Sequence, residues 1–142
     1  MARLKIELPE KLVASVSIPV RITDINYGNH LGNNSIVEII HEARAQLLQK
    51  HGFTELNVAG AALIMSELLV EFKNESFYND VLQIKIFCGE ISRVSFELFY
   101  EISVKRNQTI TIAIAKTGMV CFDYSIKKVR AVPEELKKVL SE

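Results

Sequence analysis

The sequence predicts an α+β domain in which one antiparallel sheet packs against one long helix. Two observations predict it. Apolar residues recur at helical spacing over one long stretch, residues 34–50, and alternating apolar and polar residues fill most of the chain after residue 60. The chain has 142 residues, 49% of them hydrophobic, so it can bury such a core as one domain spanning residues 1–142.

The first three elements can be assigned from local pattern. Residues 14–21 predict a first strand, and the Asn and Gly residues of the segment 22–33 predict a loop. Residues 34–50 predict an amphipathic helix. One face of this helix carries the apolar residues Ile36, Ile39, Ile40, Ala43 and Leu47, and the far face carries Glu38, Glu42, Gln46 and Gln49.

The ends of the helix also carry signals. Ser35 and Glu38 have the spacing of an N-terminal capping box, and Gly52 stands where a C-terminal stop is expected. The remaining chain is mostly strand. Strands are predicted over residues 60–73, 81–92, 95–105 and 110–124, turns over 76–80 and 106–109, and a short last helix over 133–141 with Pro133 in its first turn.

Composition argues against several classes of function. Lys plus Arg is 17 and Asp plus Glu is 17, so net charge gives no attraction to nucleic acid or an anionic membrane. The sequence has neither the apolar run of a signal peptide nor that of a membrane span, and we expect a cytoplasmic protein. Cys88 and Cys121 lie in strand-like runs and are expected to be reduced core thiols. With three scattered His residues they form no metal constellation, and no cofactor is predicted.

Two segments carry a family resemblance. Residues 24–33 read DINYGNHLGN and residues 41–44 read HEAR. They resemble hotdog-fold thioesterases of the 4-hydroxybenzoyl-CoA thioesterase-like type, in which a loop D-x-D-x-x-G-H-V-N-N leads into a helix with Y-x-x-x-F-E-x-A-R. The FYND segment at 77–80 resembles the family's yGD turn, and KKVRAVPEEL resembles its usual ending. The positions in register are Asp24, His30, Asn33, Ala43 and Arg44.

The resemblance implies a hotdog fold, an antiparallel sheet wrapped around one long central helix. It implies hydrolysis of an acyl thioester, acyl-CoA or acyl-ACP, to a free acid and a thiol. Hotdog domains pair through their sheet edges, so a homodimer or a dimer of dimers is expected, with a shared site at the dimer interface.

The polar loop before the helix fits this chemistry. Thioester hydrolysis needs an attacking group and a donor for the carbonyl oxygen as it becomes negative. A helix N-terminus offers free backbone N–H groups and the positive end of the helix dipole. The resemblance implies that the N–H near Asn33 polarises the carbonyl. We expect Tyr27, Gly32 and Asn34 to contact the substrate.

The chain departs from the family at the attacking group. The second Asp of D-x-D, commonly the catalytic carboxylate, is Asn26 here. An amide does not ionise, so Asn26 is expected to orient a water or the carbonyl by hydrogen bonding. The base is then His30, His41, which stands where the family has Glu, or Glu67 from a second chain. A neutral His can act as a base near pH 7.

Other readings stay open. Asp24 is expected to hold the loop through backbone N–H groups, and Arg44 to be a buried partner of a carboxylate. Met65 and Met119 are expected in the core, although one strand face could line an acyl tunnel. Two further functions are considered: a hotdog dehydratase or hydratase that uses His30 with an acid, and a non-catalytic acyl-thioester binding protein, for which Asn26 is the main argument.

Overall fold

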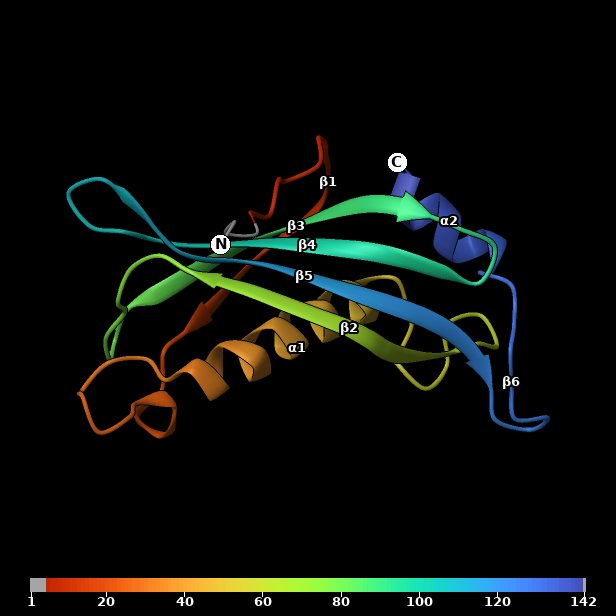
Figure 1. Cartoon of the computed structure of the whole chain (residues 1–142), viewed down its shortest axis with the longest axis horizontal. Helices are drawn as coiled ribbons and strands as arrows, with labels where there is room; N and C mark the ends of the chain where they lie inside the picture. Colours follow the sequence, from red (N-terminus) through yellow and green to blue (C-terminus); the bar gives the residue numbers. More distant parts are fainter. Residues whose placement is uncertain (1–4, 142) are drawn as a thin grey trace.

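The computed structural model describes residues 5–141 and shows a six-stranded antiparallel sheet with a long helix lying along one face (Figure 1). The sheet order is β1-β3-β4-β5-β2, with the short β6 paired to β5, so β1 and β2 form the edges of the main path. The α+β prediction is confirmed. The strands are β1 Lys11–Pro19, β2 Ala62–Phe72, β3 Val81–Ile91, β4 Ser95–Lys105, β5 Thr109–Asp123 and β6 Lys128–Val129; the helices are α1 Asn33–Lys50 and α2 Glu134–Ser141, with a 3-10 turn at Ile22–Asp24.

The predicted elements agree with these bounds except at the start of the sheet. β1 begins three residues earlier than the predicted 14–21 and ends at Pro19, after which the chain enters the 3-10 turn. β4 matches its predicted bounds, and the other long strands differ from theirs by one or two residues. The two-residue β6 was not predicted, because so short a strand has no alternation to detect.

Helix α1 buries the apolar face that the sequence predicted, including Ile36, Ile40 and Ala43. The helix ends at Lys50, two residues before Gly52, which adopts φ +78° as expected for the C-terminal stop. The Phe53 N–H donates to the Leu48 carbonyl at 2.9 Å. This geometry closes the last turn and satisfies carbonyl groups at the helix end.

The predicted capping box at Ser35 and Glu38 is wrong. The N-cap is Gly32, which makes no side-chain cap hydrogen bond. Because the helix begins at Asn33, Ser35 lies inside the first turn, where it is buried. The N–H groups of Ser35 and Ile36 donate instead to the Gly32 carbonyl, at 3.1 and 3.3 Å.

The core lies between α1 and the facing sides of β3 and β4. Tyr100 is fully buried there together with Ile84 and Ile102, and full burial of an Ile side chain contributes about 1.5–3 kcal/mol. Cys88 and Cys121 are buried free thiols, as predicted, and burial raises the pKa of both. Met119 is buried, whereas Met65 is 41% exposed because it lies on the edge strand β2, so its assignment to the core was wrong.

A β-bulge interrupts β2 at Ser66. Met65 pairs with Met119, but Glu67 pairs with Gly118, so Ser66 is an extra residue in this strand. The bulge reverses the alternation of side chains, and Glu67 therefore points away from α1. The Ser66 hydroxyl donates to the Gly118 carbonyl at 3.2 Å. A Cβ at position 118 would lie 3.2 Å from the Cβ of Glu67.

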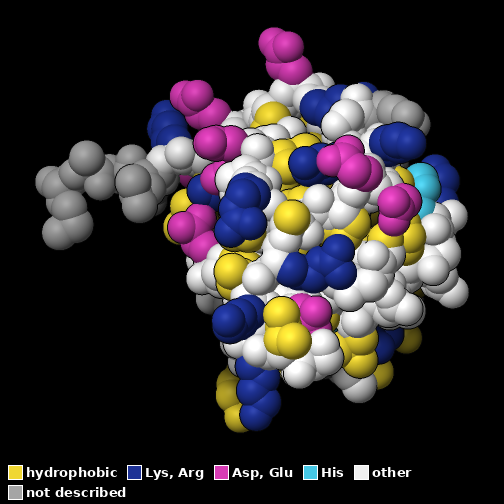
Figure 2. Space-filling view, turned by 90° about the vertical axis from the view of Figure 1, so that its right-hand side faces the viewer, with side chains coloured by type: hydrophobic (Ala, Val, Ile, Leu, Met, Phe, Trp, Pro, Cys, Tyr) yellow, Lys and Arg dark blue, Asp and Glu magenta, His cyan; other side chains and the backbone are white. Residues whose placement is uncertain are grey.

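The surface carries mixed charge. Figure 2 shows the end of the molecule that lies on the right in Figure 1, where acidic and basic side chains are interspersed with small hydrophobic groups. Within residues 5–141, no helix is both long and apolar enough to cross a membrane.

Candidate active site

The loop before α1 is shaped by Asn26. Its side-chain oxygen accepts hydrogen bonds from the backbone N–H groups of Gly28 at 2.9 Å and of His30 at 3.4 Å. The backbone N–H of Asn26 donates to the His30 carbonyl at 2.9 Å. Asn29 completes the turn at φ +64°, a left-handed conformation that Asn tolerates better than most residues. The contacts of Asn26 in this structure support the loop and hold His30 in place.

Asp24 has the structural role that the sequence predicted. It is 2% exposed, and its carboxylate accepts the Arg21 backbone N–H at 2.9 Å and the Arg21 guanidinium at 3.1 Å. Its carbonyl oxygen accepts the Gly32 N–H at 3.0 Å, which fixes the residue that starts the helix.

His30 lies beside the first turn of α1 with one ring nitrogen free. Its Nδ1 is 3.2 Å from the Leu31 carbonyl oxygen, which can only accept, so Nδ1 carries the proton in this contact. The neutral ring then presents Nε2 as an acceptor. His30 lines a cavity of about 230 Å³ together with Asn33 and Ile36. The structure therefore brings His30 and Asn33, two of the candidate site residues, to one cavity.

The first turn of α1 also presents free donors. Among residues 5–141, none accepts the backbone N–H of Asn33 or Asn34, as is usual at a helix start. Asn33 lies between two hollows: the His30 cavity, and an open depression that is lined by Asn26, Gly32 and Asn34. Tyr27 is fully exposed at the tip of the loop.

His41 lies apart from this cavity. It follows Asn33 by eight residues, about 12 Å along the helix axis. Its Nε2 is 3.2 Å from Glu55, and its side chain is 61% exposed. It lines a separate apolar pocket of about 130 Å³ with Met65 and Leu68 of the edge strand β2. The two predicted histidine bases therefore line different pockets of the chain.

Arg44 is the buried partner of a carboxylate, as predicted, and the carboxylate is Glu55. The side chain of Arg44 is 5% exposed, and its Nε donates to Glu55 while Nη1 donates to the Tyr100 hydroxyl at 3.3 Å. Burial alone would lower the pKa of Arg44, but the contacts with Tyr100 and Glu55 leave it raised. Arg44 therefore stays charged inside the core and joins α1 to the sheet.

Glu67 does not meet the His30 cavity within one chain. It is 58% exposed on the face of the sheet opposite α1 and forms an ion pair with Lys116 at 2.9 Å. Its assignment as a base from a second chain stays a prediction.

Sequence reasoning missed the residues that face His30. Glu75 comes from the loop between β2 and β3, and its carboxylate oxygen lies 3.9 Å from His30 Nε2. The same loop is joined to the residue before the N-cap of α1 by a hydrogen bond from the Leu31 N–H to the Ser76 carbonyl at 2.7 Å. The only signal in the sequence was the predicted turn at 76–80, which gives no reason to single out the charged residue before it.

Comparison with known proteins places the fold. The model of the thioesterase-like superfamily matches residues 20–140. A protein of Aquifex aeolicus (strain VF5) named "Putative esterase" is 28% identical over 103 residues, which cover 71% of this chain and 77% of that protein.

Solved structures share the fold at low sequence identity. A 1,4-dihydroxy-2-naphthoyl-CoA thioesterase from Synechocystis has a TM-score of 0.80 at 20% identity, over 90% of this chain and 95% of that one. A protein of the thioesterase superfamily from Jannaschia sp. CCS1 has a TM-score of 0.81 at 11% identity, over 93% and 83% of the two chains. The hotdog fold expected from the sequence is thereby confirmed.

Proposed function

The chain belongs to the thioesterase-like superfamily, and from this we propose that it hydrolyses an acyl-CoA or acyl-ACP to a free acid and a thiol. One observation carries the proposal. His30 and Asn33 line the same cavity, and within residues 5–141 no group accepts the backbone N–H of Asn33 at the start of α1. These are the two parts that thioester hydrolysis requires, a base and an oxyanion site.

In the proposed reaction the thioester carbonyl lies against the first turn of α1. The N–H groups of Asn33 and Asn34 and the positive end of the helix dipole stabilise the oxygen as it becomes negative. His30 takes a proton from the attacking water. Tyr27 and Gly32 are proposed to contact the substrate beside the loop.

We propose that the chain works as a homodimer or a dimer of dimers. The support is the edge strand β2, which exposes Met65, Leu69 and Phe72 along its length. In such an assembly, His41 or Glu67 could act on a site completed by the partner copy. Sedimentation at micromolar concentration tests this, and a monomer would contradict the shared site.

One observation favours a second candidate function, the dehydration or hydration of an acyl thioester. His30 faces the carboxylate of Glu75, and a histidine with an acid is the pair that such chemistry needs. The third candidate is binding without turnover, for which the amide at Asn26 is the argument.

A panel of acyl-CoA substrates separates the three functions. Release of free thiol indicates hydrolysis, a change at the acyl double bond without thiol indicates hydration, and calorimetric binding with neither indicates a binding protein. We expect thiol release. The matched control is the Asn33→Pro variant, which keeps His30 but lacks one proposed oxyanion donor.

A further inference from the structure

The cavity beside the first turn of α1 has two facing walls of different origin. His30 stands on the wall formed by the loop before α1, and Glu75 on the wall formed by the loop between β2 and β3. The His30 side chain is 30% exposed and the Glu75 side chain 66% exposed, and His30 Nε2 lies 3.9 Å from Glu75 Oε1. This distance is too long for a direct hydrogen bond between them.

The separation suits one water molecule. A water placed about 2.8 Å from both atoms donates one proton to Nε2 and the other to the carboxylate. With Nδ1 donating to the Leu31 carbonyl, Nε2 is an acceptor in the neutral imidazole, and the ionised carboxylate also accepts. A water that donates both of its hydrogen bonds to His30 and Glu75 has its oxygen lone pairs directed away from these two side chains.

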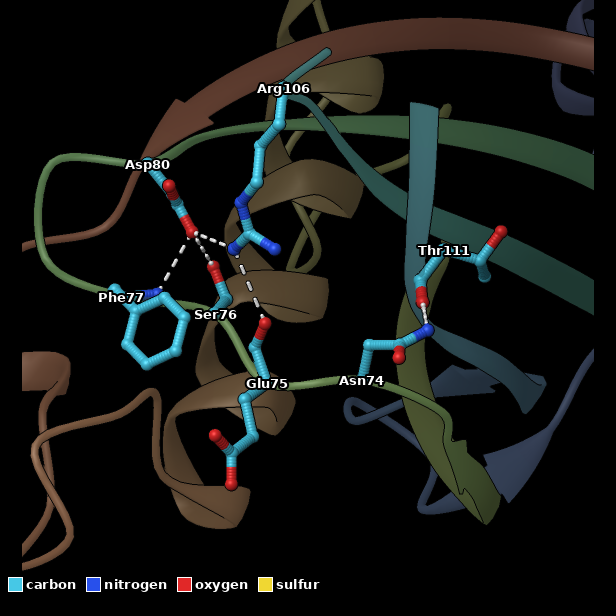
Figure 3. A network of polar contacts seen from close by, with 7 residues as sticks. All are labelled: Asn74, Glu75, Ser76, Phe77, Asp80, Arg106 and Thr111. Carbon is cyan, nitrogen blue, oxygen red and sulfur yellow. Dashed lines mark hydrogen bonds and ion pairs between the residues drawn. The ribbon is translucent and has the colours of Figure 1, made fainter. Parts of the chain in front are cut away.

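The backbone of Glu75 is held by a network of polar contacts around Arg106 and Asp80. Arg106 Nη2 donates to the Glu75 carbonyl at 3.3 Å and to the Asp80 carboxylate at 2.8 Å, and Asp80 also accepts the Ser76 hydroxyl at 2.7 Å. Figure 3 shows this network, with the Glu75 carboxylate pointing away from Arg106. The carboxylate is thus left free of the network that fixes its backbone.

The same segment is attached to the His30 loop. The Leu31 N–H donates to the Ser76 carbonyl at 2.7 Å, so the residues after His30 and Glu75 are hydrogen-bonded to each other. Arg106 also stacks over the Phe77 ring, with 5.4 Å from its guanidinium carbon to the ring centroid. The spacing of the two walls is therefore set by direct bonds between the two loops.

We infer that Glu75 and His30 together hold the attacking water, and that Arg106 is a positioning residue for Glu75. The inference rests on the proposed hydrolysis. The water oxygen bonds to the thioester carbon while one of its protons passes to His30 Nε2 and the other stays on the new hydroxyl. Collapse breaks the C–S bond, the imidazolium returns its proton to the leaving sulfur, and the products are a carboxylic acid and a thiol.

The test compares kcat and KM for Glu75→Ala, Glu75→Gln and Glu75→Asp on a thioester that the parent protein hydrolyses. We expect kcat of the Ala variant to fall about 10- to 100-fold, the range for loss of a hydrogen bond to a charged group, with KM within about twofold. Gln should be intermediate and Asp closest to the parent. Glu135→Gln on α2, at the opposite end of the molecule in Figure 1, is the matched control.

Arg106 is tested through a double variant. If Arg106 acts through Glu75, then Arg106→Ala lowers kcat in the parent but causes no further loss in the Glu75→Ala background. A merely structural role would lower kcat equally in both backgrounds and would overturn the positioning claim.

Two failures are distinguishable. If the parent hydrolyses thioesters and Glu75→Ala retains its kcat, the water site is wrong while the proposed function stands. If the parent releases no thiol from any substrate, the proposed function is wrong and the water site with it.

Discussion

The guanidinium of Arg44 donates a hydrogen bond to the hydroxyl of Tyr100 at 3.3 Å, and this hydroxyl in turn shares a 2.8 Å bond with Thr117. The chain of contacts runs from α1 across β4 to β5, entirely among buried side chains. Burial raises the pKa of Tyr100, so the phenol stays protonated and can donate to Thr117. The long helix is therefore fixed to the sheet by polar groups as well as by its apolar face.

Removing Arg44 should destabilise the fold. Arg44→Ala removes the buried donor that Glu55 and Tyr100 share and should lower the free energy of unfolding by about 3 kcal/mol. Tyr100→Phe, which keeps the ring, should cost about 1–2 kcal/mol. Urea denaturation at one fixed protein concentration measures both. Parent-like stability of Arg44→Ala would show that the buried charge adds nothing.

Replacing each histidine should identify the base. His30→Ala should lose about a hundredfold or more in kcat, because a positioned base contributes at least that much. It should also remove the fall in rate at mildly acidic pH that a histidine base causes. His41→Ala, at the separate pocket, should change kcat little. Loss of activity in His41→Ala but not in His30→Ala, or loss only in Glu67→Gln, would contradict His30 as the base and favour the proposed site shared with a second copy.

The oxyanion site can be tested at the backbone of Asn33, with a second variant that controls for the loss of its side chain. Asn33 is the first residue of α1, where proline fits the helix, and Gly32 before it is already extended with ψ 153°. Asn33→Pro therefore removes one N–H donor and should lower kcat about 10²–10³-fold. Asn33→Ala keeps the N–H and serves as the control. Equal turnover of the folded proline variant and this control would exclude the donor.

Asn26 should respond to loss of its acceptor oxygen. Asn26→Ala removes the bonds to the Gly28 and His30 N–H groups and should lower activity. Asn26→Asp keeps an oxygen in the same place and restores the residue common in the family, so it should retain or raise turnover. Steady-state kinetics on the same substrate decides. An Ala variant as active as the parent would remove Asn26 from the site.

Acid should weaken the network around Asp80. Burial raises the pKa of Asp80, but donors from Ser76, the Phe77 N–H and Arg106 outweigh it and leave the pKa below its ordinary value. Because the pKa of Asp80 is lowered in the folded state, its carboxylate stabilises the fold at pH values above the ordinary Asp pKa of about 4. This stabilisation is lost as the pH falls through the folded-state pKa. Asp80→Asn should therefore be about 1–3 kcal/mol less stable at neutral pH.

The pH dependence of the difference is the decisive measurement for Asp80. Urea unfolding of the parent and of Asp80→Asn should converge as the pH is lowered from about 7 to about 3, because the parent carboxylate becomes neutral. A gap that stays constant over this range would mean that the charge of Asp80 does not support the fold.

The sequence predicted elements whose signals are local. The apolar spacing of α1 and the stop at Gly52 are properties of neighbouring residues, and both are confirmed. Arg44 was expected to have a carboxylate partner, but Glu55 lies 11 residues later in a loop and carries no pattern that names it. Glu75 reaches His30 only because two loops meet in space.

The predicted capping box was wrong because contacts made outside the helix decide where α1 begins. Its spacing was present, but the chain enters the helix at Gly32, and the Gly32 N–H is already bound by the Asp24 carbonyl. The facing direction of Glu67 was also not readable, since the bulge at Ser66 shifts the alternation of β2 by one residue.

The bulge in β2 has a consequence for how this protein can vary. A side chain at position 118 would meet the Cβ of Glu67 and the hydroxyl of Ser66, both at 3.2 Å, so the extra residue and the glycine opposite it are mutually dependent. Deleting Ser66 would remove the contact with its hydroxyl and restore regular pairing, because Met65 and Glu67 already pair with the neighbouring residues Met119 and Gly118, so Glu67 would keep its side of the sheet. Sequence change at positions 66 and 118 is therefore expected to be correlated, with the two positions inherited as a unit.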